Sequence, residues 1–220
     1  MTITIANTKG GVGKSLIASL LIDHLIINKK GDLVVIDGDN QQSLSLWWGR
    51  KEDKPASMQQ WGSGALDDFK NPVESLPWHV IDVGGRDSKM VRIALLQSDL
   101  VVIPLSATGV DADALVDVLR LCYEAQKYNP DMRVKLVFNR MKQTKKDLNE
   151  LKKMIKDHPQ LFGDVQWLEN MLHERVSYQR TFGDGMSVLA LHEGEVGYDA
   201  KAKSETIKLC EEILDEAKKC

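Results

Sequence analysis

Short, continuous runs of apolar residues recur along the chain and alternate with stretches in which apolar residues repeat at helical spacing. The apolar runs lie at 2–6, 33–36, 78–81, 100–103 and 134–138, with a weaker run at 165–168. A strand that is apolar on both faces is typical of a parallel sheet covered by helices on both sides. We therefore expect these runs to form a mostly parallel central sheet.

The helical spacing predicts helices over about 14–28, 88–97, 111–127, 145–157 and 198–218. Strands and helices that alternate with short joints indicate a doubly wound α/β fold. The segment 50–77 contains Pro, Gly and Ser and gives no clear pattern. We expect a surface excursion there rather than a second domain, and hence a single domain over residues 1–220.

Composition and charge narrow the class of protein. Hydrophobic residues make up 43% and charged residues 28%, which is ordinary for a globular chain. With 29 Lys and Arg against 32 Asp and Glu, the net charge is −3, so any contact with nucleic acid requires a local basic patch. Three cysteines far apart give no disulfide framework. No apolar run approaches 18 residues and no signal peptide precedes the first strand, so we expect a cytoplasmic protein.

The turn after the first predicted strand carries the clearest chemistry. Residues 7–16 read Asn-Thr-Lys-Gly-Gly-Val-Gly-Lys-Ser-Leu and stand between an apolar strand and an apolar helix. Glycines let successive N–H groups face one anion, and the helix N-terminus adds partial positive charge. This context predicts a phosphate-binding loop for a nucleoside triphosphate. The dinucleotide fingerprint fails because Leu16 occupies the place of its third glycine.

Within this loop, Lys14 is expected to reach the β- and γ-phosphates, and the Ser15 hydroxyl to ligate Mg²⁺. The loop departs from the strict motif at two points: Thr8 occupies the first glycine position, and a second lysine, Lys9, stands directly before two glycines. The candidate nucleotide-binding residues of the loop are Lys9, Gly10, Gly11, Val12, Gly13, Lys14, Ser15 and Leu16.

Polar residues at the ends of later strands complete the candidate site, because ligands of an open parallel sheet lie beyond the carboxyl ends of its strands. Phosphoryl transfer needs a metal held by an acid and a group that orients the attacking water. We expect Asp82 to hold magnesium, Asp39 to orient the water and Asp37 to contact the metal indirectly. Capping of the next helix or turn is the alternative for such acids. Asn139 is placed to read a purine edge, or is a plain turn asparagine.

Residues 9–15 resemble the deviant Walker A motif of the ParA/MinD family of partitioning and positioning ATPases. Residues 35–39, followed by Gln41, are similar to the family's second acidic motif. Ile103-Pro104-Leu105 and Phe138-Asn139-Arg140 fall where the family has its fourth strand and its base loop. The late stretches 175–178 and 185–188 resemble the family before its final helix. The resemblance covers most of the chain and is weakest over 50–77.

The resemblance implies a P-loop ATPase that uses ATP and Mg²⁺ as a slow switch. ATP would join two subunits in a homodimer, with Lys9 reaching the partner's phosphates and Lys14 and Asp39 completing the catalytic set. The dimer would bind DNA without sequence preference and position a plasmid, chromosome or other cargo on the nucleoid. A ParB-like adaptor or cargo protein would stimulate hydrolysis. The chain begins at the first strand, as in short ParA proteins without an N-terminal DNA-reading domain, so operator-specific repression is not expected.

Two departures from the family bear on hydrolysis: Asn40 stands where proline is usual, and Val83-Gly84-Gly85 replaces the usual threonine-proline after Asp82. Two other functions stay open. An accessory ATPase of conjugative DNA transfer would share every motif named above. A ligase similar to dethiobiotin synthetase would need a substrate pocket and would turn over quickly without DNA.

Between Arg133 and Lys156, nine basic residues face only two acidic ones. Such a cluster is either a salt-sensitive DNA-binding patch or a solvated helix face. The start of the last helix is a second candidate, closer to where the family places DNA contacts. The candidate DNA-binding residues are Arg140, Lys142, Lys145, Lys146, Lys201 and Lys203.

The last predicted helix carries an apolar stripe, and its other face is acidic: Glu211, Glu212, Asp215 and Glu216. Anionic lipid would repel that acidic face. We therefore expect the stripe to pack against the sheet and expect no membrane tether.

Overall fold

The computed structural model describes residues 1–29, 32–52, 54, 57–60, 78–84, 89–106, 112–142, 145–163 and 165–219. Its elements are β1 (Thr2–Asn7), α1 (Lys14–Ile27), β2 (Leu33–Asp37), α2 (Ser43–Arg50), β3 (Ser57–Gln60), β4 (Trp78–Gly84), α3 (Lys89–Leu96), β5 (Leu100–Ser106), α4 (Ala112–Gln126), β6 (Arg133–Asn139), α5 (Lys145–Lys156), α6 (Pro159–Phe162), β7 (Gln166–Trp167), α7 (Val176–Gly183) and α8 (Ala200–Ala217).

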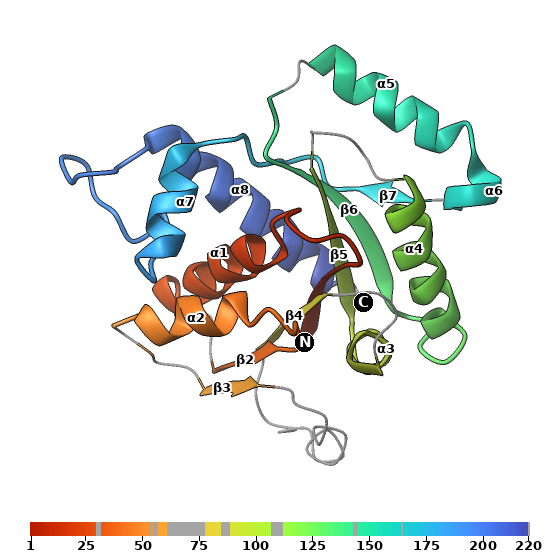
Figure 1. The fold of residues 1–220 in the computed structure, drawn as a ribbon, viewed down its shortest axis with the longest axis horizontal. Helices are drawn as coiled ribbons and strands as arrows, with labels where there is room; N and C mark the ends of the chain where they lie inside the picture. The colour runs from red at the N-terminus through yellow and green to blue at the C-terminus, as the bar shows by residue number, and fades with distance from the viewer. Residues whose placement is uncertain are drawn as a thin grey trace.

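The strands form one parallel sheet in the order β3-β2-β4-β1-β5-β6-β7 (Figure 1). The order reverses at β1, which lies between β4 and β5, so the predicted doubly wound α/β fold is confirmed. The pairing register places Asp82 beside both Asp37 and Ile5, and Gly84 beside Asn7. The last residues of β1, β2 and β4 therefore meet at one edge of the sheet, next to the loop that follows β1.

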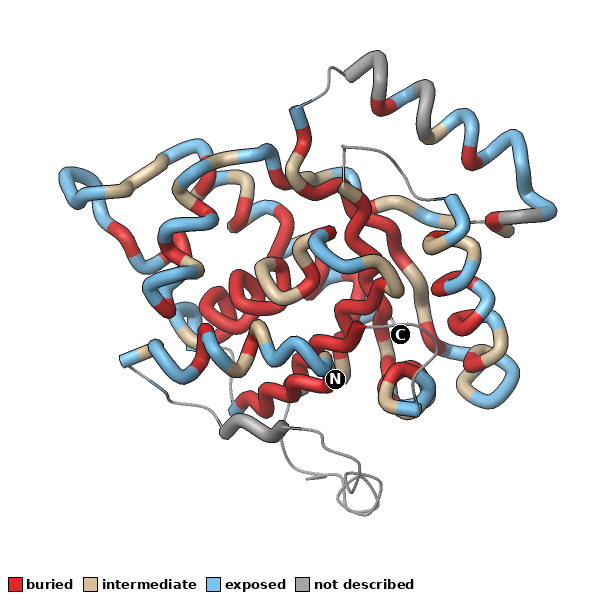
Figure 2. The backbone as a smooth tube through the Cα atoms, in the orientation of Figure 1, coloured by how far each residue is buried: buried red, intermediate tan, exposed pale blue. Residues whose placement is uncertain are grey.

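Helices cover both faces of the sheet and create two apolar layers. One layer packs α1, α2, α7 and α8 against the sheet, and the other packs α3, α4, α5 and α6. Helix α1 is buried on nearly all sides, from Ile17 through Leu25 (Figure 2). Because every residue from Ile17 to Leu25 is buried, the polar Ser19, Asp23 and His24 included, α1 gives the loop before it a fixed base.

Helix α8 confirms the prediction that its apolar stripe packs inward. Leu209, Cys210, Ile213 and Leu214 are buried in the layer that contains α1. The Asp199 side chain caps the helix by accepting hydrogen bonds from the first turn. Across the described ranges, no helix is both long enough and apolar enough to cross a bilayer.

The predicted strands and the long helices are all present, with ends that differ by a few residues from those expected. The sequence patterns missed α2, α6, α7 and the edge strand β3. Each of these elements has only four to eight residues, and β3 reads Ser-Met-Gln-Gln with no apolar run. Part of the expected surface excursion is thus a strand of the sheet, and residues 61–77 lie outside the described residues.

Candidate functional site

The loop between β1 and α1 is shaped for an anion. Gly11 and Gly13 have left-handed φ angles of 75° and 92°, which favour glycine. Gly13 is the N-cap of α1 and, as a glycine, has no side chain that could accept hydrogen bonds from the first turn. The N–H groups that begin α1 are therefore not capped by this residue, and together with the helix dipole they provide a phosphate site.

The strand side of the loop is held by two polar residues. Asn7 donates from its amide to the Pro104 carbonyl at 2.8 Å, and its Oδ1 accepts the Lys9 N–H at 2.8 Å. The Thr8 hydroxyl donates to the Ala114 carbonyl of α4 at 3.0 Å. Asn7 was missed by sequence reasoning, although a polar residue at the end of a buried strand is a recognisable signal.

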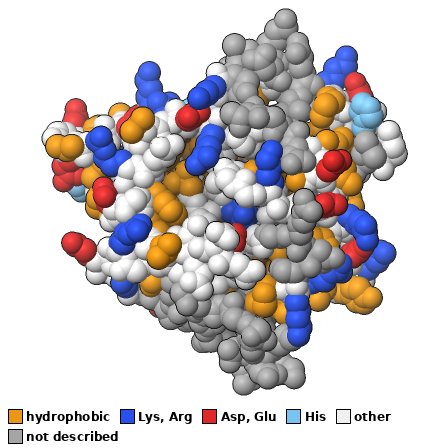
Figure 3. All heavy atoms as spheres, viewed as in Figure 1, with side chains coloured by type: hydrophobic (Ala, Val, Ile, Leu, Met, Phe, Trp, Pro, Cys, Tyr) orange, Lys and Arg blue, Asp and Glu red, His pale blue; other side chains and the backbone are white. Residues whose placement is uncertain are grey.

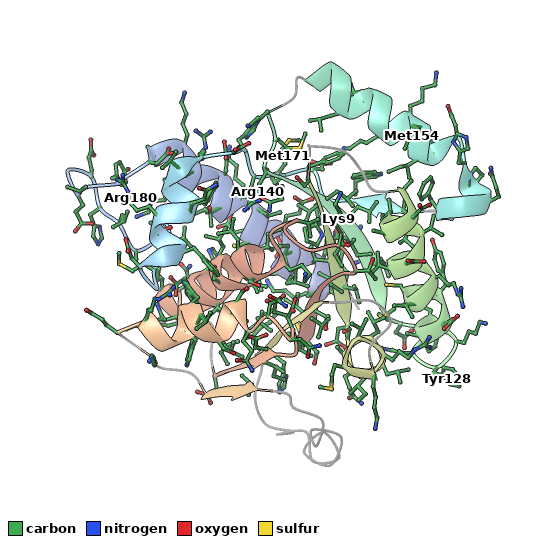
Figure 4. The ribbon with its side chains drawn as sticks, in the orientation of Figure 1. Lys9, Tyr128, Arg140, Met154, Met171 and Arg180 are labelled. Carbon is green, nitrogen blue, oxygen red and sulfur yellow. The ribbon has the colours of Figure 1, made fainter. Side chains whose placement is uncertain are left out.

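The loop is also held from β6 (Figure 4). The Asn139 amide, buried at the strand end, donates to the Val12 carbonyl at 2.8 Å. The Arg140 guanidinium donates to the Gly11 carbonyl at 3.0 Å. A Cβ on Gly13 would stand 1.9 Å from the Asn139 amide nitrogen, so this glycine permits the contact. Base reading by Asn139 stays a prediction. Arg140, which was expected in a DNA-binding patch, follows β6 and contacts the loop between β1 and α1.

Asp82 and Ser15 form the candidate magnesium site. Asp82 is fully buried, and its Oδ2 accepts a hydrogen bond from the Ser15 hydroxyl at 2.5 Å. Its Oδ1 is buried with no hydrogen-bond partner among the described residues. Burial raises the pKa of Asp82 to about 7, against the opposing effects of Ser15 and Lys14. An unpartnered carboxylate oxygen beside a hydroxyl fits a hard divalent cation.

No group of three or more acidic, His or Cys side chains in the described part of the chain forms a cage for a metal ion. Magnesium commonly keeps several waters and binds through few protein groups together with substrate phosphates. Ser15 and Asp82 are the residues that would hold it, and when bound it would neutralise charge on the phosphates.

The charge on Asp82 makes stability depend on pH. Its carboxyl has a pKa of about 7 when folded and 3.8 as a free group, so between about pH 4 and 7 the folded state keeps a proton that the unfolded state loses, and the fold is progressively destabilised as the pH rises. Without nucleotide and metal, Asp82→Asn is expected to stabilise the protein at pH 8 by up to about 4 kcal/mol, and much less at pH 4. Thermal unfolding at both pH values measures this, and an equal gain at the two would contradict the assignment.

Asp37 braces the site. Its Oδ2 accepts hydrogen bonds from the Ser45 N–H and hydroxyl at 2.7 and 2.6 Å, and its Oδ1 accepts the Asp39 N–H at 3.1 Å. Asp37 thus joins the end of β2 to the first turn of α2, which corresponds to the capping alternative. The indirect magnesium contact expected for Asp37 stays a prediction.

Asp39 directly contacts Lys14, the lysine expected to bind phosphate. Its Oδ2 lies 3.3 Å from the Lys14 ammonium, and both side chains are largely buried. Its Oδ1 accepts the Gln41 N–H at 3.0 Å, which fixes the carboxylate in the turn. The first departure from the family, Asn40, is an exposed turn residue. In the second, Gly84 lies against the Lys14–Asp39 pair, and Gly85 lies outside the described residues.

A cavity of about 320 Å³ lies over the loop. Of the site residues predicted from the sequence, those that line this cavity are Gly10, Gly11, Gly13, Lys14, Ser15, Leu16, Asp39, Asn139 and Arg140. Lys9 and Val12 line a second cavity of about 180 Å³. The structure therefore separates the two loop lysines, with Lys14 lining the first cavity and Lys9 the second.

Sequence reasoning missed the far wall of the first cavity, which includes Arg175, Tyr178 and Phe182. Arg175 makes two hydrogen bonds to the Glu205 carboxylate, at 3.2 and 2.5 Å, and the Tyr178 hydroxyl donates to the Ala202 carbonyl. These contacts attach the wall to α8. The helical spacing of Tyr178 and Phe182 was the available signal, within the late stretch that resembles the family.

Among the described residues, the basic side chains of the 133–156 cluster are not gathered at one end of β6. Arg133 and Lys135 begin β6 and pair with Glu216 at 2.7 and 2.8 Å, whereas Arg140 follows the other end of that strand. On the face shown in Figure 3, basic side chains alternate with acidic ones among the described residues. The strand separates the two ends by about 20 Å, at roughly 3.3 Å per residue.

The remaining DNA candidates differ in their contacts. Lys142 pairs with Glu174 at 2.9 Å, and Lys203 donates to the Leu191 carbonyl at 2.7 Å. Lys201 is exposed at the start of α8. The side chains of Lys145 and Lys146 lie outside the described residues.

The family model described as CobQ/CobB/MinD/ParA nucleotide binding domain matches residues 3–188. The chain belongs to this family. The glycine-rich loop at 7–16, the candidate magnesium residues and the strand-end acids thus all lie within the matched region.

The relatives of this CobQ/CobB/MinD/ParA chain include a carboxysome distribution protein and a ParA protein. It is 26% identical over 196 residues to the maintenance of carboxysome distribution protein A of Halothiobacillus neapolitanus, covering 86% of this chain and 87% of that one. It is 30% identical over 134 residues to protein ParA of Rhizobium radiobacter, covering 57% of each chain. A solved ATP complex of Cyanothece McdA superposes with a TM-score of 0.70 at 15% identity, covering 97% of this chain and 96% of that one. The last comparison shows the shared fold.

Proposed function

We propose that this protein is an ATP-driven positioning switch, carried by one ATPase domain over residues 1–220. In this proposal it binds ATP and Mg²⁺, forms a sandwich homodimer, binds DNA without sequence preference and hydrolyses ATP slowly. The observation that carries the proposal is the convergence of Lys14, Ser15, Asp39 and Asp82 on one loop at the carboxyl edge of the sheet. The ParA and carboxysome-distribution names of its relatives support a role in positioning cargo.

Each residue has a task in this mechanism. Lys14 and the α1 N-terminus bind the phosphates, and Ser15 and Asp82 hold the magnesium ion. Asp39, at the turn beside Lys14, orients the water that attacks the γ-phosphate. Asn139 and Arg140 keep the loop in shape by holding the carbonyls of Val12 and Gly11. We also propose that the Asn139 amide contacts the base.

Lys9 is proposed to act on the partner subunit. It lines the second cavity rather than the one lined by Lys14, and its backbone is fixed by Asn7. A cation presented from the partner adds positive charge where negative charge develops in the transition state. Hydrolysis then removes the shared phosphate and releases the dimer from DNA on the nucleoid. A ParB-like adaptor on the cargo is the proposed stimulus.

DNA binding tests this proposal. The Asp39→Ala protein is expected to bind random-sequence duplex DNA with ATP and Mg²⁺ but not with ADP, and binding should weaken steeply as salt rises. Fluorescence anisotropy at two salt concentrations measures both effects. Binding that is equal with ATP and ADP, or that ignores salt, would contradict the DNA-riding switch.

A matched pair of variants locates the contact. Lys201 and Lys208 are both exposed on α8, but only Lys201 is a DNA candidate. In the Asp39→Ala background, Lys201→Ala is expected to weaken DNA binding and to lower, by about one, the slope of the logarithm of the binding constant against the logarithm of the salt concentration. Lys208→Ala should leave both the affinity and the slope unchanged. Equal effects of the two variants would remove Lys201 from the interface.

A further inference from the structure

In the ion pair between Lys14 and Asp39, two side chains with different proposed tasks contact each other. The ammonium that would bind phosphates lies 3.3 Å from the carboxylate that would orient water, with only 7% and 12% of the side chains exposed. Ion pairs that are shielded from solvent are screened less by salt than exposed pairs are. Because Lys14 is also the residue proposed to bind phosphate, the phosphate oxygens and the Asp39 carboxylate compete for the same cation.

Gly84 makes room for this pair. A Cβ at position 84 would stand 2.0 Å from Asp39 Oδ2, 2.6 Å from Lys14 Cε and 2.7 Å from Lys14 Nζ. The two Lys14 atoms are at the far end of a long side chain, and Oδ2 is the Asp39 oxygen that the Gln41 N–H does not hold, so a methyl group would displace these side-chain atoms and leave the backbone in place. Gly84 also ends β4 outside the group of glycines with positive φ, so alanine suits its backbone.

The rest of the site holds the carboxylate ready for an exchange of partners. The Gln41 N–H binds Asp39 Oδ1, and the Asp39 N–H binds Asp37, so the backbone and one oxygen of Asp39 are fixed independently of Lys14. Lys14 is the first residue of the buried helix α1. Only the Lys14 side chain must move for phosphates to replace Asp39 as its partner.

We propose that Gly84 is a positioning residue that permits a latch, in which Asp39 holds Lys14 until nucleotide phosphates displace it. Binding of nucleotide then frees the Asp39 carboxylate for its task, so the acid is available only when the substrate is present. The inference rests on the proposed function of the site and adds a control on nucleotide affinity.

The test measures the affinity for ADP and Mg²⁺, which involves neither hydrolysis nor the γ-phosphate. Gly84→Ala is expected to tighten ADP binding by about three- to tenfold, because the competing ion pair is lost. Gly49→Ala is the control, since Gly49 is exposed on α2 and a Cβ there meets nothing within 4 Å. Isothermal titration calorimetry gives the constants, and thermal unfolding checks that each variant is folded.

A double-mutant cycle separates the latch from a general effect of the methyl group. Asp39→Asn removes the pair by itself and should also tighten ADP binding. In that background Gly84→Ala should add nothing. An equal gain from Gly84→Ala in both backgrounds, or no gain in the wild-type background, would overturn the latch. If Gly84→Ala failed to fold, unchanged ADP affinity in Asp39→Asn would still overturn it. Failure of the wild-type protein to bind ADP would instead overturn the proposed function.

Discussion

Lys14→Ala is expected to abolish nucleotide binding, with a loss of affinity of at least about 100-fold for ATP and ADP. The ammonium of Lys14 lies beside Asp39, and it lowers the pKa of the buried Asp82, which Asp37 and Asp39 raise. Without this cation, the Asp39 carboxylate, which lines the cavity over the loop, would face the incoming phosphates unpaired. The variant therefore loses an attractive contact and gains net repulsion.

Calorimetric titration with ADP and Mg²⁺ measures this loss directly. Lys127→Ala is a suitable control, because Lys127 is exposed in the turn after α4 and removes the same charge from the chain. Affinity of the Lys14 variant within threefold of the wild type would show that the loop does not bind phosphates through this residue.

The second large effect is expected from Asp39→Ala, which should retain ATP binding and lose hydrolysis by about 100-fold or more. The carboxylate is the only acid of the site that touches Lys14 among the ion pairs of the described residues, and the turn at Gln41 fixes its orientation. Without a group to orient the attacking water, ATP should persist in the site and the dimer should stay closed. Phosphate release and the mass in solution with ATP, measured by light scattering, report the two properties.

Asp131→Ala provides the matched control, because Asp131 is an exposed acid in the turn before β6 and does not line the cavity that Asp39 lines. It should hydrolyse ATP at close to the wild-type rate. If Asp39→Ala hydrolysed ATP normally, the water-orienting role would be wrong. If it stalled hydrolysis without holding a dimer, the coupling between ATP and dimerisation would be wrong.

Much of the site can be predicted from the local sequence, because two continuous patterns, the apolar runs and the glycine-rich loop, define its backbone. The apolar runs predict parallel strands, and in a parallel sheet the residues that follow the strands share one edge. That rule places Asp37, Asp39 and Asp82 near the loop at 9–15 before any contact is known. The glycines and the helix after them define the anion site in the same way.

Side-chain partners could not be predicted, because they come from residues far apart in the sequence. Arg140 contacts Gly11 across 129 positions, and Arg133 contacts Glu216 across 83, so a cluster of positive charges in the sequence became two separate sets of contacts. Helix α2 depends on Asp37 at its first turn and on Trp47, whose indole donates to the Met186 carbonyl. Short elements of this kind carry too little pattern of their own.

The sequence by itself determined the α/β fold, the phosphate loop and the strand-end acids, because periodicity, glycine placement and the direction of parallel strands act over short distances. Only the tertiary structure decided what those groups touch. The register of β1 and β4 brings Gly84 to the loop, and the missing side chain there lets Lys14 meet Asp39. A residue's role in this site depends on the space its neighbours leave, and that space exists only once the sheet is assembled.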